Sequence, residues 1–118
     1  MRIRLMSVGL ALAIAGATAP AHAASFDCNK ARTPDEFAIC GNPSLSLLDT
    51  EMGALWFSYS RIPMMMGSNG ARHDDAQQFL ADRGQCGRSV ACLTQLYKRR
   101  NADLRKGIVD ALGRLTLE

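Results

Sequence analysis

The chain is poor in side chains that catalyse reactions or bind nucleic acids. Its 118 residues include only two histidines, His22 and His73, and four cysteines, none in a C-x-x-C spacing. The formal net charge is +3, and it falls to near neutral once an N-terminal signal that carries two arginines is removed. A chain without a strong basic field is not expected to bind nucleic acid. We therefore look for a function outside that class.

Long apolar runs are also scarce, and the single one lies at the N terminus. Two arginines precede an apolar run over residues 5–19, and Ala-His-Ala at 21–23 is a small-x-small cleavage pattern. The run is shorter than the roughly 20 residues that a membrane helix needs. We therefore expect residues 1–23 to be a cleaved secretion signal and residues 24–118 to be one domain, periplasmic or secreted, without stable membrane insertion.

The mature chain lacks the period-two alternation of β-strands and shows helical patterns instead. Thr33-Pro34 followed by Glu36 forms a capping box before a short helix that should end at Gly41. Asn42-Pro43 repeats the start signal. Apolar residues then follow at steps of three and four up to Ile62, which is typical of an amphipathic helix.

Two further helices are expected in the second half. Pro63 and the Gly-Ser-Asn-Gly segment at 67–70 should form a loop before a third helix over about 71–83, with Ala76, Phe79 and Leu80 turned inward. Ser89 can cap a fourth helix, whose inward stripe is Leu93, Tyr97, Arg100, Leu104, Ile108, Ala111 and Leu115. The predicted fold class is all-α: a small disulfide-stapled helical bundle of three main helices plus a short N-terminal helix.

The four cysteines Cys28, Cys40, Cys86 and Cys92 allow three pairings. We favour local pairing, because Cys86 and Cys92 flank a turn-prone stretch and the other two bracket one short helix. A zinc site or a redox pair is the alternative. The spacing and the lack of a nearby histidine argue against both, so we predict structural disulfides and no metal.

Two cysteine-centred motifs carry a family resemblance. The first comprises Phe26-Asp27-Cys28, Thr33, Glu36, Ala38-Ile39-Cys40, Pro43, Leu45, Leu48-Asp49 and Tyr59. The second comprises Leu80, Arg83, Cys86-Gly87, Ala91-Cys92-Leu93, Tyr97, Arg100 and Leu104. Together they resemble the LprI-like lysozyme-inhibitor domain over nearly the whole mature chain. The resemblance implies a small exported helical domain and, for the namesake of the family, inhibition of host lysozyme.

Two charged positions within these motifs, Asp49 and Arg100, lie on the strongest helices. They could form an ion pair between helices or belong to a recognition surface. Arg100 falls on the apolar stripe of its helix. Because charges that face the interior of a small bundle usually have partners, we favour the structural ion pair.

The strongest candidates for partner binding are Met64, Met65 and Met66, followed by Asp74 and Asp75. Methionine makes adaptable apolar contacts, so we expect the three thioethers to form a hydrophobic contact element. Thioethers also bind copper(I), and His73 is close enough in sequence to join them, which is the alternative. The two aspartates favour the start of the third helix and could also steer a cationic partner.

No set of residues suggests catalysis, since no cysteine is free once both disulfides form. We therefore expect no enzyme activity and no cofactor. The leading hypothesis is an exported non-enzymatic binding protein that inhibits lysozyme. The alternative is a periplasmic accessory, stress or toxin-immunity protein that binds another envelope partner, and copper binding through the methionines comes third. The sequence leaves the oligomeric state open.

Overall fold

The computed structural model describes residues 24–117, so the predicted signal segment lies outside the described residues. A short 3₁₀-helix, η1 (Cys28–Lys30), is followed by α1 (Pro34–Gly41), α2 (Pro43–Ser60), α3 (Met66–Cys86) and α4 (Val90–Leu115). Residues 24–117 contain no strand. The predicted all-α fold is confirmed.

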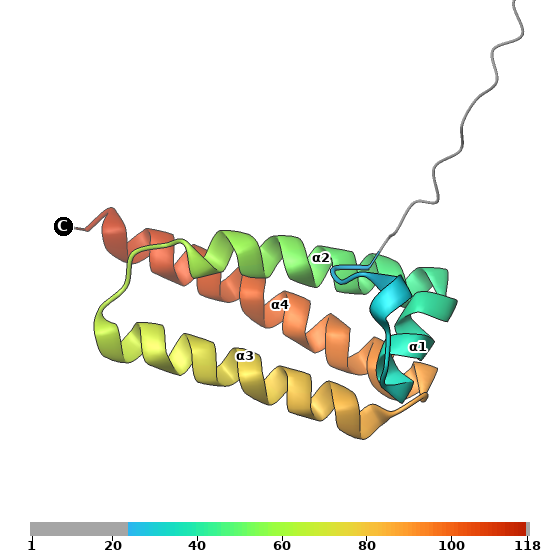
Figure 1. Cartoon of the computed structure of the whole chain (residues 1–118). Helices are drawn as coiled ribbons and strands as arrows, with labels where there is room; N and C mark the ends of the chain where they lie inside the picture. Colours follow the sequence, from blue (N-terminus) through green and yellow to red (C-terminus); the bar gives the residue numbers. More distant parts are fainter. Residues whose placement is uncertain (1–23, 118) are drawn as a thin grey trace, which may run out of the picture.

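The helices form a bundle with two dissimilar ends. Figure 1 shows α2 and α4 side by side along their length, with α3 beneath them and α1 across one end. The α3–α4 turn lies at the end that α1 covers, and the α2–α3 loop lies at the opposite end. Of the described helices, none combines the length and the apolar character that a membrane crossing requires.

Side chains at the helix starts explain why three boundaries were predictable. The Asn42 side chain accepts a hydrogen bond from the Leu45 backbone N–H (3.1 Å), and the Ser89 hydroxyl accepts one from Cys92 N–H (3.2 Å). Glu36 accepts from the backbone of Thr33 and so completes the predicted capping box. Each contact satisfies backbone donors that a helix start leaves free.

The hydrophobic core lies toward the end that α1 covers. Tyr97 is fully buried and packs edge to face on Phe79, with ring centroids 5.3 Å apart. The buried apolar residues around them are Ile39, Leu45, Met52, Leu93 and Leu104. Toward the opposite end, the last buried apolar residue of α4 is Ala111. One end of the bundle is therefore much better packed than the other.

The structure corrects the expected start of the third helix. Residues 67–70, predicted as a loop, form the first turn of α3, which begins at Met66. Each helical glycine costs about 1 kcal/mol relative to alanine, and this cost is offset because Arg72 binds the Asn69 side chain and the end of α2.

Two expected core residues are exposed instead. Leu80 and Leu115 are each 44% exposed, whereas Arg72 and Arg83 are buried. Residues 72, 76, 79 and 83 follow steps of four and three, so this narrow stripe faces inward and Leu80 lies beside it. The sequence pattern predicted a helical period for α3 correctly. The predicted inward face omitted Arg72 and Arg83, which are buried.

Candidate functional site

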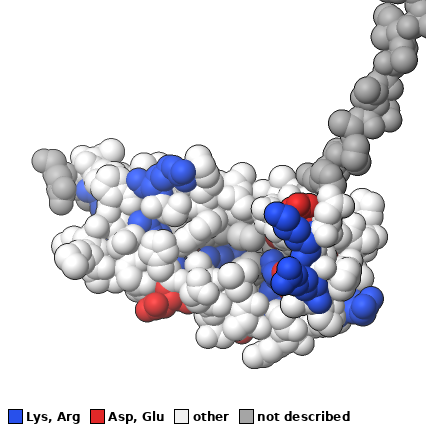
Figure 2. All heavy atoms as spheres, viewed as in Figure 1, with Lys and Arg blue, Asp and Glu red and all other residues white. Residues whose placement is uncertain are grey.

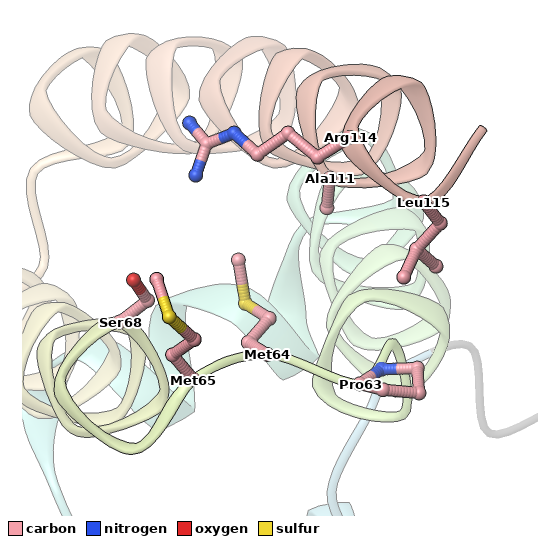
Figure 3. Close-up of a pocket in the computed structure, with 7 residues that line it drawn as sticks. All are labelled: Pro63, Met64, Met65, Ser68, Ala111, Arg114 and Leu115. Carbon is pink, nitrogen blue, oxygen red and sulfur yellow. The ribbon is translucent and has the colours of Figure 1, made fainter. Parts of the chain in front are cut away.

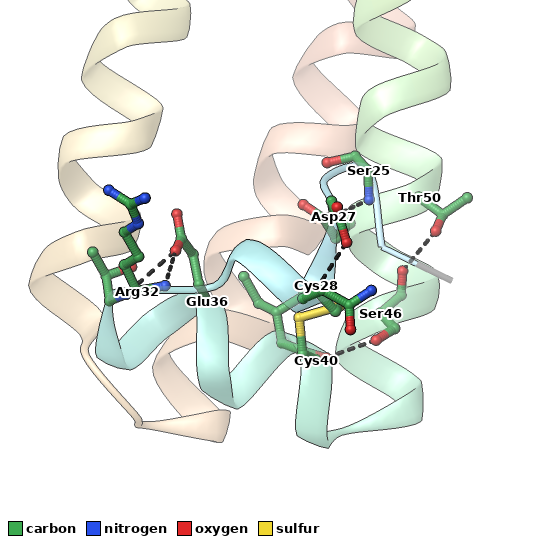
Figure 4. Close-up of a disulfide and its surroundings, with 12 residues drawn as sticks. Ser25, Asp27, Cys28, Arg32, Glu36, Cys40, Ser46 and Thr50 are labelled. Carbon is green, nitrogen blue, oxygen red and sulfur yellow. Dashed lines mark hydrogen bonds between the residues drawn. A yellow bond between two sulfur atoms is a disulfide. The ribbon is translucent and has the colours of Figure 1, made fainter. Parts of the chain in front are cut away.

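Two disulfides close the end of the bundle that α1 covers. Cys28 pairs with Cys40 and Cys86 with Cys92, with Cα–Cα distances of 5.8 and 5.5 Å. The local pairing is confirmed, and Figure 4 shows the first disulfide between η1 and the end of α1. Gly87, at φ +56°, supplies the left-handed backbone between α3 and α4. Two such disulfides are typical of proteins that mature in an oxidising environment outside the cytosol.

A buried ion pair lies next to these disulfides. Arg83 Nε of α3 donates to Asp35 Oδ2 of α1 at 2.7 Å, and both residues are less than a tenth exposed. Burial by itself raises the pKa of Asp35, but the Thr33 side chain and the Arg83 guanidinium outweigh it and hold that pKa below its ordinary value. Asp35 is therefore an ionised structural group with its partner in place.

The buried carboxylate of Asp49 accepts two hydrogen bonds at the same end of the molecule. The Tyr97 hydroxyl donates to Asp49 Oδ1 at 2.7 Å, and the backbone N–H of Ser25 donates to Oδ2. Burial first, and the neighbouring Asp49 carboxylate second, raise the pKa of the Tyr97 phenol. Asp49 thus fastens the N-terminal arm to the bundle, and its oxygens are occupied by protein donors.

Arg100 does not pair with Asp49, so the predicted contact between them is wrong. Arg100 bonds instead to Asp75 of α3 and lies near the rings of Trp56 and Phe79, at 5.9 and 5.3 Å from their centroids. The physical reason is that the Tyr97 hydroxyl, one turn earlier on α4, already donates a hydrogen bond to the Asp49 carboxylate. Arg100 still joins two helices, as expected for a charge on an apolar stripe.

The opposite end of the bundle carries an open pocket of about 360 Å³. It lies between the α2–α3 loop and the last turns of α4 (Figure 3) and is lined by Pro63, Met64, Met65, Ser68, Ala111, Arg114 and Leu115. In this view the thioethers of Met64 and Met65 extend from the loop toward Arg114, which reaches over the opening. A small apolar pocket with one cation is a suitable anchor point for a ligand group.

A second hollow of about 330 Å³ shares Met64, Ser68, Ala111 and Arg114 with this pocket. It extends between α3 and α4 as far as Asp75. We call the two hollows together the loop-end groove. Both signs of charge line it, because Arg72, Asp75, Asp110 and Arg114 all contribute.

The loop-end groove contains three of the five predicted partner-binding residues. Met64 and Met65 line the pocket and Asp75 lines the second hollow. Met66 is 92% exposed and Asp74 is also exposed, but neither belongs to the lining. The structure therefore brings together part of the predicted set and leaves two of its members at the surface.

Arg72 is a site residue that the sequence reasoning missed. Its guanidinium donates to the backbone oxygens of Ser60 (3.2 Å) and Ile62 (3.1 Å), and to that of Tyr59. A cation at a helix C terminus satisfies free carbonyls and opposes the negative end of the helix dipole. Arg72 thus fixes the end of α2 against α3 and forms one wall of the groove. Its place on the 72–76–79–83 stripe was the available signal.

The residues proposed for copper binding are not assembled in one place. His73 packs edge-on against Trp56, with ring centroids 5.4 Å apart, and is not among the residues that line the groove. Within residues 24–117, no three His, Cys, Asp or Glu side chains cluster in a metal-binding arrangement. The copper alternative would have to rest on the thioethers alone.

No family model, no curated protein and no solved structure matches the chain. The resemblance to the LprI-like domain therefore stays a prediction.

Proposed function

We propose that the protein is exported to the periplasm or secreted, and that it inhibits lysozyme by binding it through the loop-end groove. The observation that carries this proposal is the open, methionine-walled pocket with Arg114 across its mouth, at the end of the bundle away from both disulfides. Lysozyme is proposed as the partner because the two cysteine motifs resemble those of the LprI-like lysozyme-inhibitor domain.

The exposed thioethers favour a binding role for this surface. Met65 is 83% exposed and Met66 is 92% exposed. Adjacent exposed apolar side chains are unfavourable in water and commonly mark an interaction site. Methionine is suited to such a site because its flexible, polarisable side chain adapts to the shape of a partner.

Charge provides the link to lysozyme. The cleft of a lysozyme holds two carboxyl groups that act on the glycosidic bond, and a cation beside an apolar anchor matches such a cleft. Arg114, next to Met64 and Met65, is a cation in that position. Acidic atoms are visible over the first half of α3 in Figure 2, the segment that carries Asp74 and Asp75. An acidic rim would steer a cationic lysozyme toward the groove.

The test is the rate at which lysozyme clears a suspension of cell walls, measured with and without purified mature protein. We expect clearance to slow at a fixed molar ratio, with no cleavage of cell wall by the protein alone. Arg114→Glu should weaken inhibition, because it replaces the cation that faces the lysozyme carboxylates. Lys98→Glu is the matched control, since it makes the same charge change at an exposed position of α4 outside the groove.

Absence of inhibition for every lysozyme type, at micromolar excess, would refute the proposal. The alternative is then an envelope accessory, stress or toxin-immunity protein that uses the same groove for another protein partner. The mixed charge of the lining, to which Arg72, Asp75, Asp110 and Arg114 contribute, favours this second candidate. In that case Arg114→Glu should still abolish binding of the cognate partner, and Lys98→Glu should not.

A further inference from the structure

We propose that Met65 and Met66 are a reversible oxidation site, and that sulfoxide formation at Met65 switches the pocket of the loop-end groove from apolar to polar. The effect on lysozyme rests on the proposed function, whereas the oxidation itself rests only on where the thioethers lie. Residues 24–118 contain four methionines. Met52 is 9% exposed in the core and Met64 is half-buried, but Met65 and Met66 are 83% and 92% exposed.

The thioethers are the sulfur groups of this protein that remain open to oxidation. All four cysteines are already joined in disulfides. A hydroperoxide can still transfer one oxygen atom to a methionine sulfur. A sulfur lone pair forms the new S–O bond while the O–O bond of the peroxide breaks, so the sulfide is oxidised to a sulfoxide and hydrogen peroxide is reduced to water. Methionine sulfoxide reductases reverse this product.

The position of Met65 gives its oxidation a structural consequence. Its side chain lies beside Ser68 and extends toward Arg114 across the pocket (Figure 3). A sulfoxide oxygen is a hydrogen-bond acceptor, and the hydroxyl of Ser68 and the guanidinium of Arg114 are donors. Oxidation therefore gives Arg114 a partner on the opposite wall, which holds its guanidinium over the opening, and it replaces the apolar wall of the pocket with a polar one.

The same positions keep this change local. The fully buried part of the core lies mainly toward the other end of the bundle, and its methionine, Met52, is shielded within it. Sulfoxide formation at Met65 and Met66 adds polarity where the side chains already meet water, so the folded state persists and reduction can restore the groove. An exposed methionine in the wall of the groove, with an exposed neighbour, and a buried methionine in the core is an arrangement that suits a reversible switch.

The first experiment treats the folded mature protein with dilute hydrogen peroxide and follows each methionine by peptide mass spectrometry. We expect Met65 and Met66 to gain one oxygen atom first, with Met52 on the order of tenfold slower because oxidant reaches it mainly through opening of the fold. Far-UV circular dichroism should remain unchanged while only the loop is oxidised. Equal rates for Met52 and Met65, or unfolding with the first oxygen added, would overturn the proposal.

The second experiment separates the effect of Met65 from that of its neighbours. Met65→Gln places a polar group of similar length in the pocket and should reproduce the oxidised state without oxidant. Met65→Leu keeps the wall apolar and cannot be oxidised at residue 65, so its binding after peroxide should stay close to its own binding before peroxide, whereas binding by the wild type falls. Full activity of Met65→Gln, or inactivation of Met65→Leu to the wild-type extent, would contradict the switch.

Two readouts keep this result distinct from a failure of the proposed function. The first is lysozyme inhibition, and the second is fluorescence of anilinonaphthalene sulfonate, an apolar anion that matches the methionine wall and Arg114. Oxidation of the wild type, or Met65→Gln, should lower the dye signal several-fold, whereas the dye signal of Met65→Leu should not fall further when peroxide is added. A dye response without lysozyme inhibition would support the switch and refute the lysozyme proposal. No dye response in a protein that inhibits lysozyme regardless of oxidation would refute the switch alone.

Discussion

The two ends of this bundle differ in how their charged and apolar side chains are arranged. At the disulfide end, charged groups are buried and each has a partner: Asp35 with Arg83, and Asp49 with Tyr97. At the loop end, the chain reverses through a segment whose thioethers face solvent, and Arg72 holds the end of α2 from inside. Both disulfides and a buried ion pair lie at the same end, and apolar side chains are exposed at the other. Binding elements are commonly drawn from the less stable regions of a protein.

The largest expected effect tests whether the buried ion pair dominates the disulfide end. Asp35→Ala removes the carboxylate that is hydrogen-bonded to Arg83 and leaves this buried cation with only Glu36, 3.7 Å away, which should lower the free energy of unfolding by about 3 to 5 kcal/mol. Chemical denaturation monitored by circular dichroism measures this. Asp74→Ala is the control at an exposed position and should change stability by less than about 0.5 kcal/mol. A small effect at Asp35 would mean that water reaches Arg83 and that the two ends are less different than described.

The disulfide between η1 and α1 should contribute somewhat less. Replacing Cys28 and Cys40 together by alanine frees the N-terminal arm, and should cost about 2 to 4 kcal/mol through the entropy of the unfolded chain. Lysozyme inhibition, measured at a temperature where the variant stays folded, should be retained, because the groove lies at the opposite end. Loss of inhibition in a folded variant would show that the two ends are coupled.

Sequence patterns were most successful at the disulfide end, and the reason is that local signals operate there. Asn42 and Ser89 cap their helices within three residues, and each cysteine pair closes a short loop. These features depend on neighbours in the chain, so they can be read without knowing the fold.

The incorrect predictions have a common physical cause. The periodicity of one helix shows which residues face inward, but not which residues of another helix they will contact. The apolar stripe of α4 correctly predicted that Arg100 is buried. It did not reveal that Tyr97 would donate a hydrogen bond to Asp49. The pocket was missed as a unit because Pro63, Ser68 and Arg114 come from separate segments. Glycines at 67 and 70 predicted a loop, but the buried Arg72 next to them stabilises a helical turn.

The stability of the protein should depend on pH through two buried groups of the disulfide end, Asp35 and Tyr97. The pKa of Asp35 is lowered from 3.8, so its contribution to stability is present above about pH 3.8 and is lost as the pH falls below that value. The pKa of Tyr97 is raised from 10.0, so its contribution is present below pH 10.0 and is lost as the pH rises beyond it. Melting temperature should therefore fall at both extremes.

Matched variants assign each limb of this profile. Asp35→Asn should reduce the acidic limb to the part that Glu36 supplies, because backbone hydrogen bonds from Arg32 and Thr33 also lower the pKa of Glu36. Tyr97→Phe should flatten the alkaline limb, because it removes the phenol that titrates. Short incubations limit disulfide exchange at high pH. If either variant keeps the full wild-type slope, the corresponding limb comes from other groups, and the contrast between the two ends would rest on geometry alone.

The smallest expected effect on stability is at the loop end, and it is the sharpest test of the comparison. Met65→Ser removes most of an exposed side chain, so the free energy of unfolding should change by less than about 0.5 kcal/mol. Inhibition of lysozyme should nevertheless fall, since the variant loses an apolar wall of the pocket. Leu47→Ser is the matched control, because Leu47 is 66% exposed on α2 and does not line the groove. Loss of stability at Met65, or equal loss of inhibition at Leu47, would show that the loop end has no separate binding role.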